Sequence, residues 1–338
     1  KLTQIKLNKT TFAEKCLTLS KLTTTEKRKI MMKDTKNEAL TPSTPDPSGN
    51  SPAHPSAASS RKPLLSGWLD ALVAVVILFV AQLFGGVLCV ALGILPPTEI
   101  LTTSFDSEVL ERAASLQARF VAITYLISTI LGFALLWLYA RLRRCRAGLE
   151  FGSKGWGTPI RLLNGYLLIW CITIALEPLS ELLPGDQSAL GSGGWLLLSA
   201  VVLAPLFEEV VFRGYVASSL RRSYGGLVAW IGSALAFGLV HLIPSVVLSA
   251  SLMGLVLGYF ALRYRSLWLS IVLHAMHNAT ACFLRTVDME DVAGKELMGG
   301  STAYWVLYAV ATVIALTSLV RMGKEICRLK SDNYNREV

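Results

Sequence analysis

Apolar runs of bilayer length dominate the chain from residue 68 to residue 320. A run of about 17 to 25 mostly apolar residues is long enough to cross a bilayer as a helix, and about eight runs qualify. They lie approximately at 68–95, 120–140, 160–176, 195–220, 226–243, 246–262, 267–284 and 303–320. With 53% hydrophobic and 16% charged residues and a mean hydropathy of +0.51, the composition is too apolar for an ordinary soluble domain. The sequence therefore predicts an all-α, polytopic membrane protein of about eight transmembrane helices.

The first 63 residues differ in kind from the rest of the chain. They hold 12 Lys/Arg against 5 Asp/Glu, which accounts for most of the net charge of +9, so no nucleic-acid partner is expected. Residues 38–63 are rich in Pro and Ser and nearly free of large apolar side chains, which is typical of disorder. We therefore expect a disordered, basic N-terminal tail at 1–63 and a membrane domain at 64–330.

Charged residues between the apolar runs alternate in sign. Basic residues cluster at 61–62, 141–146, 221–222, 263–265 and 321–330, whereas acidic residues gather at 97–119, 177–194 and 285–301. Because cytoplasmic loops carry an excess of Lys and Arg, this pattern predicts that both termini lie in the cytoplasm, with the protein in the cell membrane. The six cysteines show no CxxC spacing, and we expect them to be packing residues.

Three charges fall inside one apolar run: Glu208, Glu209 and Arg213, in the stretch FEEVVFRGYV. A charge in the bilayer costs several kcal/mol and normally faces a partner or a water-filled cavity. Residues four apart share a helix face, so Glu209 can pair with Arg213, while Glu208 points about 100° away. The spacing predicts a bracing ion pair beside a carboxylate that is left for chemistry.

Polar residues recur in two further runs, as Phe237 and His241 in FGLVH and as His274 and Asn278 in HAMHN. Measured along the predicted helices, Glu208, His241, His274 and Asn278 lie ~14 to 22 Å from the cytoplasmic, basic ends. Agreement in depth predicts that Glu208, His241, His274 and Asn278 meet in one cavity. His277 is as readily explained as a helix–helix hydrogen-bonding residue, and Tyr259 and Cys282 as packing residues.

These three stretches carry a family resemblance. EEVVFR, FGLVH and HAMHN resemble, in order, the EExxxR, FxxxH and HxxxN motifs of the CPBP intramembrane proteases, which include the type II CAAX prenyl endopeptidases and proteins related to bacteriocin self-immunity. The motif core spans 195–284. The resemblance implies a helical membrane endopeptidase in which Glu208 and His241 activate water, His274 and Asn278 stabilise the oxyanion, and Glu209, Arg213 and Phe237 support them.

The cofactor is left open at this point. Glu208, His241 and His274 could bind a divalent metal such as zinc, with water in the open position. Asparagine is a poor zinc ligand, however, and a metal-free glutamate mechanism explains the same residues. We therefore slightly favour a metal-free reaction.

Other classes fit less well. The sequence has no HExxH, and its GSGG at 191–194 falls in a predicted loop. An aspartyl protease needs two membrane aspartates, and Asp70, near the start of the first span, is the only candidate. An ion-coupled transporter or a non-catalytic membrane immunity or binding protein would also use membrane Glu and His. Neither needs the second glutamate with its arginine or the HxxxN spacing. The expected partners are the lipid bilayer and a membrane-associated peptide or protein, whether or not prenylated.

Overall fold

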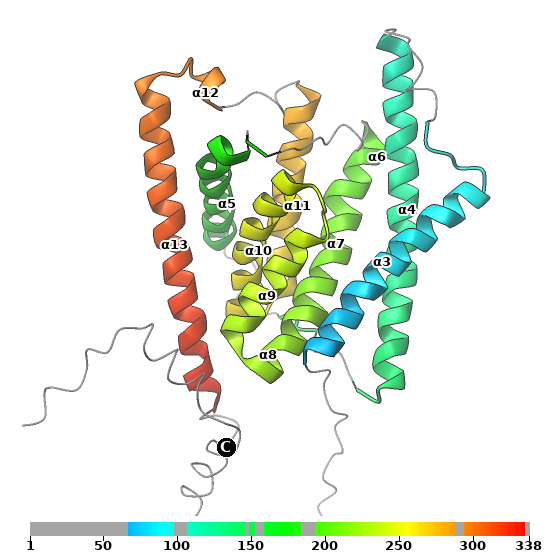
Figure 1. Ribbon diagram of the computed structural model, residues 1–338, viewed down its shortest axis with the longest axis horizontal. Coiled ribbons are helices and arrows are strands. Elements are labelled where there is room, and N and C mark those ends of the chain that lie inside the picture. The colour runs from blue at the N-terminus through cyan, green and yellow to red at the C-terminus, as the bar shows by residue number, and fades with distance from the viewer. Residues whose placement is uncertain are drawn as a thin grey trace, which may run out of the picture. The chain divides into compact units, whose positions relative to one another are not determined.

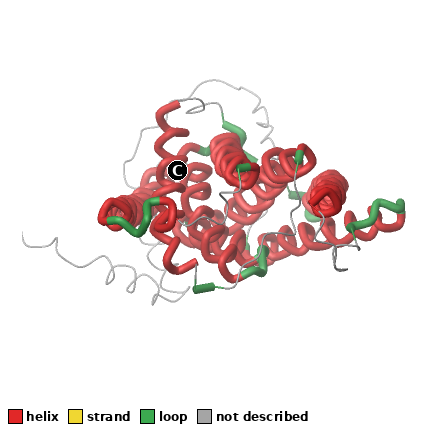
Figure 2. Tube along the Cα trace, turned by 90° about the horizontal axis from the view of Figure 1, so that it is seen from above, coloured by secondary structure: helices red, strands yellow, loops and turns green. Residues whose placement is uncertain are grey.

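The computed structural model describes residues 67–97, 107–145, 149–152, 159–180, 182–183, 193–287 and 294–334. The chain divides into two units, Lys1–Ser59 and Ser60–Val338, and all the described residues belong to the second. The expected disordered tail at 1–63 lies outside the described residues. Within the described ranges the regular structure is entirely helical (Figures 1 and 2), which confirms the all-α class.

Long helices build most of the second unit. They are α3 (Trp68–Ala91), α4 (Ser107–Leu142), α5 (Pro159–Ser180), α9 (Gly226–Leu239), α10 (Pro244–Tyr264), α11 (Leu267–Thr286) and α13 (Thr302–Tyr334), with the short α12 (Gly294–Leu297) before α13. One further span is composite and runs without a break from Gly194 to Tyr224. Its parts are α6 (Gly194–Leu197), the π-helix η3 (Leu198–Leu203), α7 (Ala204–Glu209), the π-helix η4 (Val210–Ala217) and α8 (Ser218–Tyr224).

Seven helices of the described residues are long and apolar enough to cross a membrane, so the protein is an integral, multi-pass membrane protein. The expected span at 226–243 is the exception. Its helix α9 has 14 residues, or ~21 Å, which is short of a hydrocarbon core of about 30 Å. The apolar sequence continues past the helix into a turn where Leu242 has a φ of 64°, and α10 then starts at Pro244. In Figure 1 this turn lies below the upper ends of α4, α11 and α13.

The composite span is the most enclosed of the seven, with 61% of its apolar window buried against 17% for α13. Its π-helix η3 packs on α4 and α11, α7 packs on α11, and η4 packs on α3 and α9. Helices α9 and α10 form a hairpin, and α5 packs on both α10 and α13. The segment that carries the paired glutamates is therefore surrounded by other helices.

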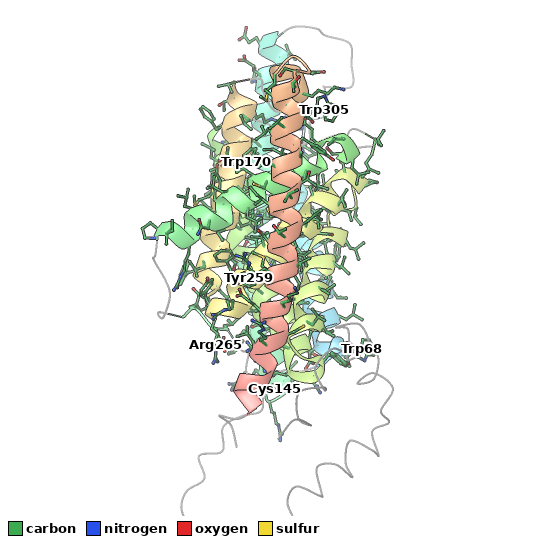
Figure 3. The ribbon with its side chains drawn as sticks, turned by 90° about the vertical axis from the view of Figure 1, so that its left-hand side faces the viewer. Trp68, Cys145, Trp170, Tyr259, Arg265 and Trp305 are labelled. Atoms are coloured by element: carbon green, nitrogen blue, oxygen red, sulfur yellow. The ribbon has the colours of Figure 1, made fainter. Side chains whose placement is uncertain are left out.

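The outer surfaces of the helices suit a bilayer. Leu83 and Ile130 are 72% and 65% exposed, as expected for side chains that face lipid. Trp68 and Trp305 are also exposed and lie toward opposite ends of the second unit (Figure 3), where tryptophans anchor helices at membrane interfaces. Among the cysteines of the described residues, Cys89 and Cys282 are buried.

Candidate active site

Glu208 and Glu209, adjacent at the end of α7, have different surroundings. Glu209 is fully buried, and its Oε1 accepts a 2.8 Å hydrogen bond from Nη1 of Arg213. This is the pair that the four-residue spacing predicts. Glu208 retains 8% of its exposure and points elsewhere, so only one of the two carboxylates is committed to an ion pair.

Arg213 is held on three sides. Besides Glu209, its Nη2 donates to the carbonyl oxygen of Gly254 at 3.1 Å, and its guanidinium lies 4.5 Å from the ring centroid of Phe237. A Cβ at Gly254 would approach Phe237 Cδ1 to 3.2 Å and Ala234 Cα to 3.1 Å. The glycine therefore allows α10 to approach α9 closely enough for its carbonyl to reach the arginine.

His274 lies between the two glutamates. Its Nδ1 is 3.0 Å from Glu209 Oε1, and its Nε2 is 3.9 Å from Glu208 Oε2. A carboxylate paired with an arginine only accepts hydrogen bonds, so Nδ1 carries the proton. In the neutral ring, Nε2 then presents its lone pair toward Glu208. Helix α11 thus joins the structural carboxylate to the free one through a single imidazole.

Phe237 links both histidines to the arginine. Its buried ring makes edge contacts with His241 and His274 at centroid distances of 5.2 and 5.6 Å. His241 is half-buried in the turn that follows α9, and its Nδ1 lies 2.9 Å from the carbonyl oxygen of Phe237, near the end of that helix. Because that carbonyl only accepts, Nδ1 is the nitrogen that donates, which leaves Nε2 as an acceptor in the neutral ring.

Asn278 follows His274 by one turn of α11. Its Nδ2 donates to the carbonyl oxygen of Ala200 at 2.7 Å, in η3, about two helical turns before Glu208. The composite span and α11 therefore run antiparallel. The Glu208–His274 and Ala200–Asn278 contacts are two successive points at which they meet. One N–H of the amide remains for another acceptor.

Comparison with known families identifies the segment that carries these residues. Residues 191–280 match the family model named Rce1-like, which is described as type II CAAX prenyl endopeptidase Rce1-like. Residues 191–280 form an Rce1-like domain. The match supports a CPBP-family intramembrane protease, which is a hydrolase. No curated protein and no solved structure matches the chain.

The Rce1-like domain contains every motif residue predicted from the sequence, from Glu208 to Asn278. The structure sets Glu208 beside His274 and joins His241 to them through Phe237. Asn278 lies one turn further along α11. Among the described residues, His241 and Glu208 share no hydrogen bond or ion pair, and Asn278 donates to Ala200 rather than to any of the other three. The contacts therefore do not join the four residues into the single cluster that was expected.

The Rce1-like domain does not group its donors as metal ligands. In the part of the chain that the structure describes, no three His, Cys, Asp or Glu side chains are placed to hold a metal ion. The set Glu208, His241 and His274, suggested by residue type, does not fit a bound metal in this arrangement.

One residue outside the Rce1-like domain reaches the site without having been predicted. The hydroxyl of Tyr125, on α4, donates to Glu208 Oε1 at 3.2 Å. A single tyrosine in an apolar run carries no sequence signal. By contrast, His277 packs against Trp170 of α5 at 6.0 Å between ring centroids, and Tyr259 donates to Glu325 on α13 at 2.6 Å, so its expected role of packing alone was incomplete.

Proposed function

We propose that the protein hydrolyses a peptide bond of a membrane-associated protein or peptide, with Glu208 as the base that activates water. The observation that carries the proposal is the placement of Glu208. Of the two adjacent carboxylates, it is the one that pairs with no arginine. It retains some exposure, and its Oε2 lies 3.9 Å from Nε2 of His274.

The proton path follows from the contacts. Glu208 removes a proton from a water molecule as the water oxygen attacks the scissile carbonyl carbon. Glu208 then passes this proton to Nε2 of His274. The resulting imidazolium is stabilised by Glu209, to which its Nδ1–H is already bonded. It then protonates the leaving amine as the C–N bond breaks, which yields a carboxylic acid and an amine. A distance of 3.9 Å is long for transfer, but such contacts often tighten when substrate binds.

Two further groups complete the proposal. Nε2 of His241 would accept a hydrogen bond from the attacking water, and the remaining N–H of Asn278 would donate to the oxyanion of the tetrahedral intermediate. This keeps Glu208 as the base and gives the proton relay to His274, the nearer imidazole. Because the donors are not grouped as metal ligands, the reaction proposed is metal-free.

The substrate proposal is a membrane-associated polypeptide, of which a prenylated, CAAX-like C-terminus is one form.

The basic helix ends meet at one side of the second unit. Nε of Arg263 lies 3.6 Å from Glu325 Oε2, which joins α10 to α13, and Gly67 N–H bonds to Ser219 O at 3.0 Å, which joins α3 to α8. We propose that this side is cytoplasmic, in the cell membrane, with both termini there.

The test is cleavage by purified protein in detergent or vesicles of a membrane-peptide library that includes prenylated peptides, read by mass spectrometry. Glu208→Gln and His274→Ala should abolish turnover. Glu325→Gln is the matched control, because this carboxylate also accepts a tyrosine hydroxyl yet lies outside the site. Absence of cleavage by folded wild type across the library would overturn the proposal in favour of an immunity, binding or transport protein.

A further inference from the structure

The hydroxyl of Tyr125 is the only contribution of α4 to Glu208 among the described residues. It lies in the second membrane helix, 66 positions before residue 191, where the Rce1-like match begins. Tyr125 and Glu208 are 83 residues apart in sequence, so only the packing of α4 on the composite span brings them together.

The position of α4 against α7 is fixed by a second contact. Phe133 lies two turns after Tyr125 on the same face of α4, and its ring packs edge-on against Phe207 at a centroid distance of 5.6 Å. Phe207 is fully buried and immediately precedes Glu208. An aromatic pair of this kind stabilises its helix contact by about 0.5 to 1.5 kcal/mol beyond area burial. The tyrosine is therefore presented to Glu208 from a helix that is held in register.

The contact distinguishes the two oxygens of Glu208. Oε1 accepts from Tyr125, while Oε2 faces Nε2 of His274. The terminal torsion of a glutamate is broad, so an unrestrained carboxylate can turn between many orientations. A donor on one oxygen fixes the plane of the carboxylate and leaves the other oxygen directed at the imidazole.

We propose that Tyr125 is a positioning residue for Glu208, and that the active site therefore extends to α4, beyond the Rce1-like domain. The proposal rests on the function proposed above. Tyr125 holds Oε1 so that Oε2 takes the proton from water and delivers it to His274. It contributes to the alignment of the base and makes no contact that the substrate needs for binding.

The kinetic test uses a variant that removes only the hydroxyl oxygen of Tyr125. In Tyr125→Phe, kcat should fall about 10- to 100-fold, because small misalignments of a reacting group cost rates of this order, while KM stays within about 2-fold. Tyr139→Phe is the matched control. It lies on the same helix, ~21 Å away, and its hydroxyl donates to another buried carboxylate, Asp70, at 2.5 Å. Its kcat should match that of wild type.

A second readout is independent of turnover. The infrared difference spectrum between wild type and Glu208→Gln isolates the carboxylate bands of Glu208. Tyr125→Phe should shift these bands, whereas Tyr139→Phe should leave them in place. Both variants keep the aromatic ring and lose one hydrogen bond to a carboxylate, so we expect similar, small decreases in melting temperature. Such a match between the two variants would exclude a packing effect at Tyr125.

The outcomes separate the two proposals. Wild-type kcat in Tyr125→Phe, or unshifted Glu208 bands, overturns the role of Tyr125 and leaves the protease function standing. Absence of wild-type cleavage overturns the protease function, and the band shift then shows by itself whether Tyr125 holds Glu208. A parallel rise in KM would overturn positioning in favour of substrate binding.

Discussion

The Nδ1 atom of His274 lies 3.0 Å from Oε1 of Glu209, the same oxygen that accepts a 2.8 Å hydrogen bond from Arg213. One carboxylate oxygen thus serves a cation and an imidazole at once. Because Glu209 is occupied in this way, the two adjacent glutamates divide their roles. Glu209 fixes the histidine, and Glu208 is left for the role of base that we propose.

The first prediction separates these two roles by stability. Glu209→Gln leaves the buried Arg213 without its counter-charge and should lower the free energy of unfolding by about 3 to 5 kcal/mol. In Glu208→Gln the amide oxygen can still accept from the Tyr125 hydroxyl, and no buried arginine loses its counter-charge, so the cost should be about 1 kcal/mol or less. Thermal unfolding in detergent measures both.

A double variant is the control for this comparison. Adding Arg213→Met to Glu209→Gln removes the uncompensated charge and should recover part of the lost stability, since neutral side chains of similar volume often replace buried ion pairs at little cost. Equal stability of the single variants Glu209→Gln and Glu208→Gln would contradict the division of roles.

The close approach of α9 and α10 gives a second prediction. In Gly254→Ala the new methyl group would crowd Ala234 and Phe237, and we expect a loss of about 1 to 3 kcal/mol from overpacking. Gly86→Ala is the matched control, because a Cβ there meets nothing within 4 Å and alanine favours a helix by about 1 kcal/mol. A neutral Gly254→Ala would argue against the tight hairpin.

The contact between Asn278 and η3 provides a third prediction. Asn278→Asp removes the N–H that bonds to Ala200 O and sets two acceptors face to face, so stability should fall by about 1 to 3 kcal/mol and turnover with it. Thr280→Val, on the same helix, removes only the hydroxyl that contacts Tyr166 and should preserve turnover. If Asn278→Asp cleaved at the wild-type rate, its amide would have no part in the reaction.

Metal dependence is the fourth prediction. Since Glu208, His241 and His274 are not grouped as ligands among the described residues, kcat should be unchanged by chelators, and purified protein should contain less than one equivalent of metal. Elemental analysis and assays before and after dialysis against chelator measure this. Activity lost on dialysis and restored by zinc would refute the metal-free reaction.

Orientation is the fifth prediction. In a background with the native cysteines replaced, Ser223→Cys, on the basic side, should react with an impermeant maleimide only from the cytoplasm. Lys295→Cys, between α11 and α13, should react only from the opposite side. Both positions are exposed. Labelling from the reverse sides would invert the proposed topology.

Local pattern predicted much of this molecule. The apolar runs predicted seven of the spans, and the four-residue spacing predicted the pairing of Glu209 with Arg213. Both follow from the helix itself, whose length and periodicity depend on neighbouring residues in the chain. For the same reason, the length of α9 was overestimated, because the turn after it is as apolar as the helix.

The sequence by itself determined which helices carry polar residues and which of those residues share a face. The tertiary structure alone decided that His274, rather than His241, lies beside Glu208, and that Tyr125 reaches the same carboxylate from α4. These contacts join residues 66 and 83 positions apart. They depend on how the helices pack against one another, and helix periodicity carries no information about that packing.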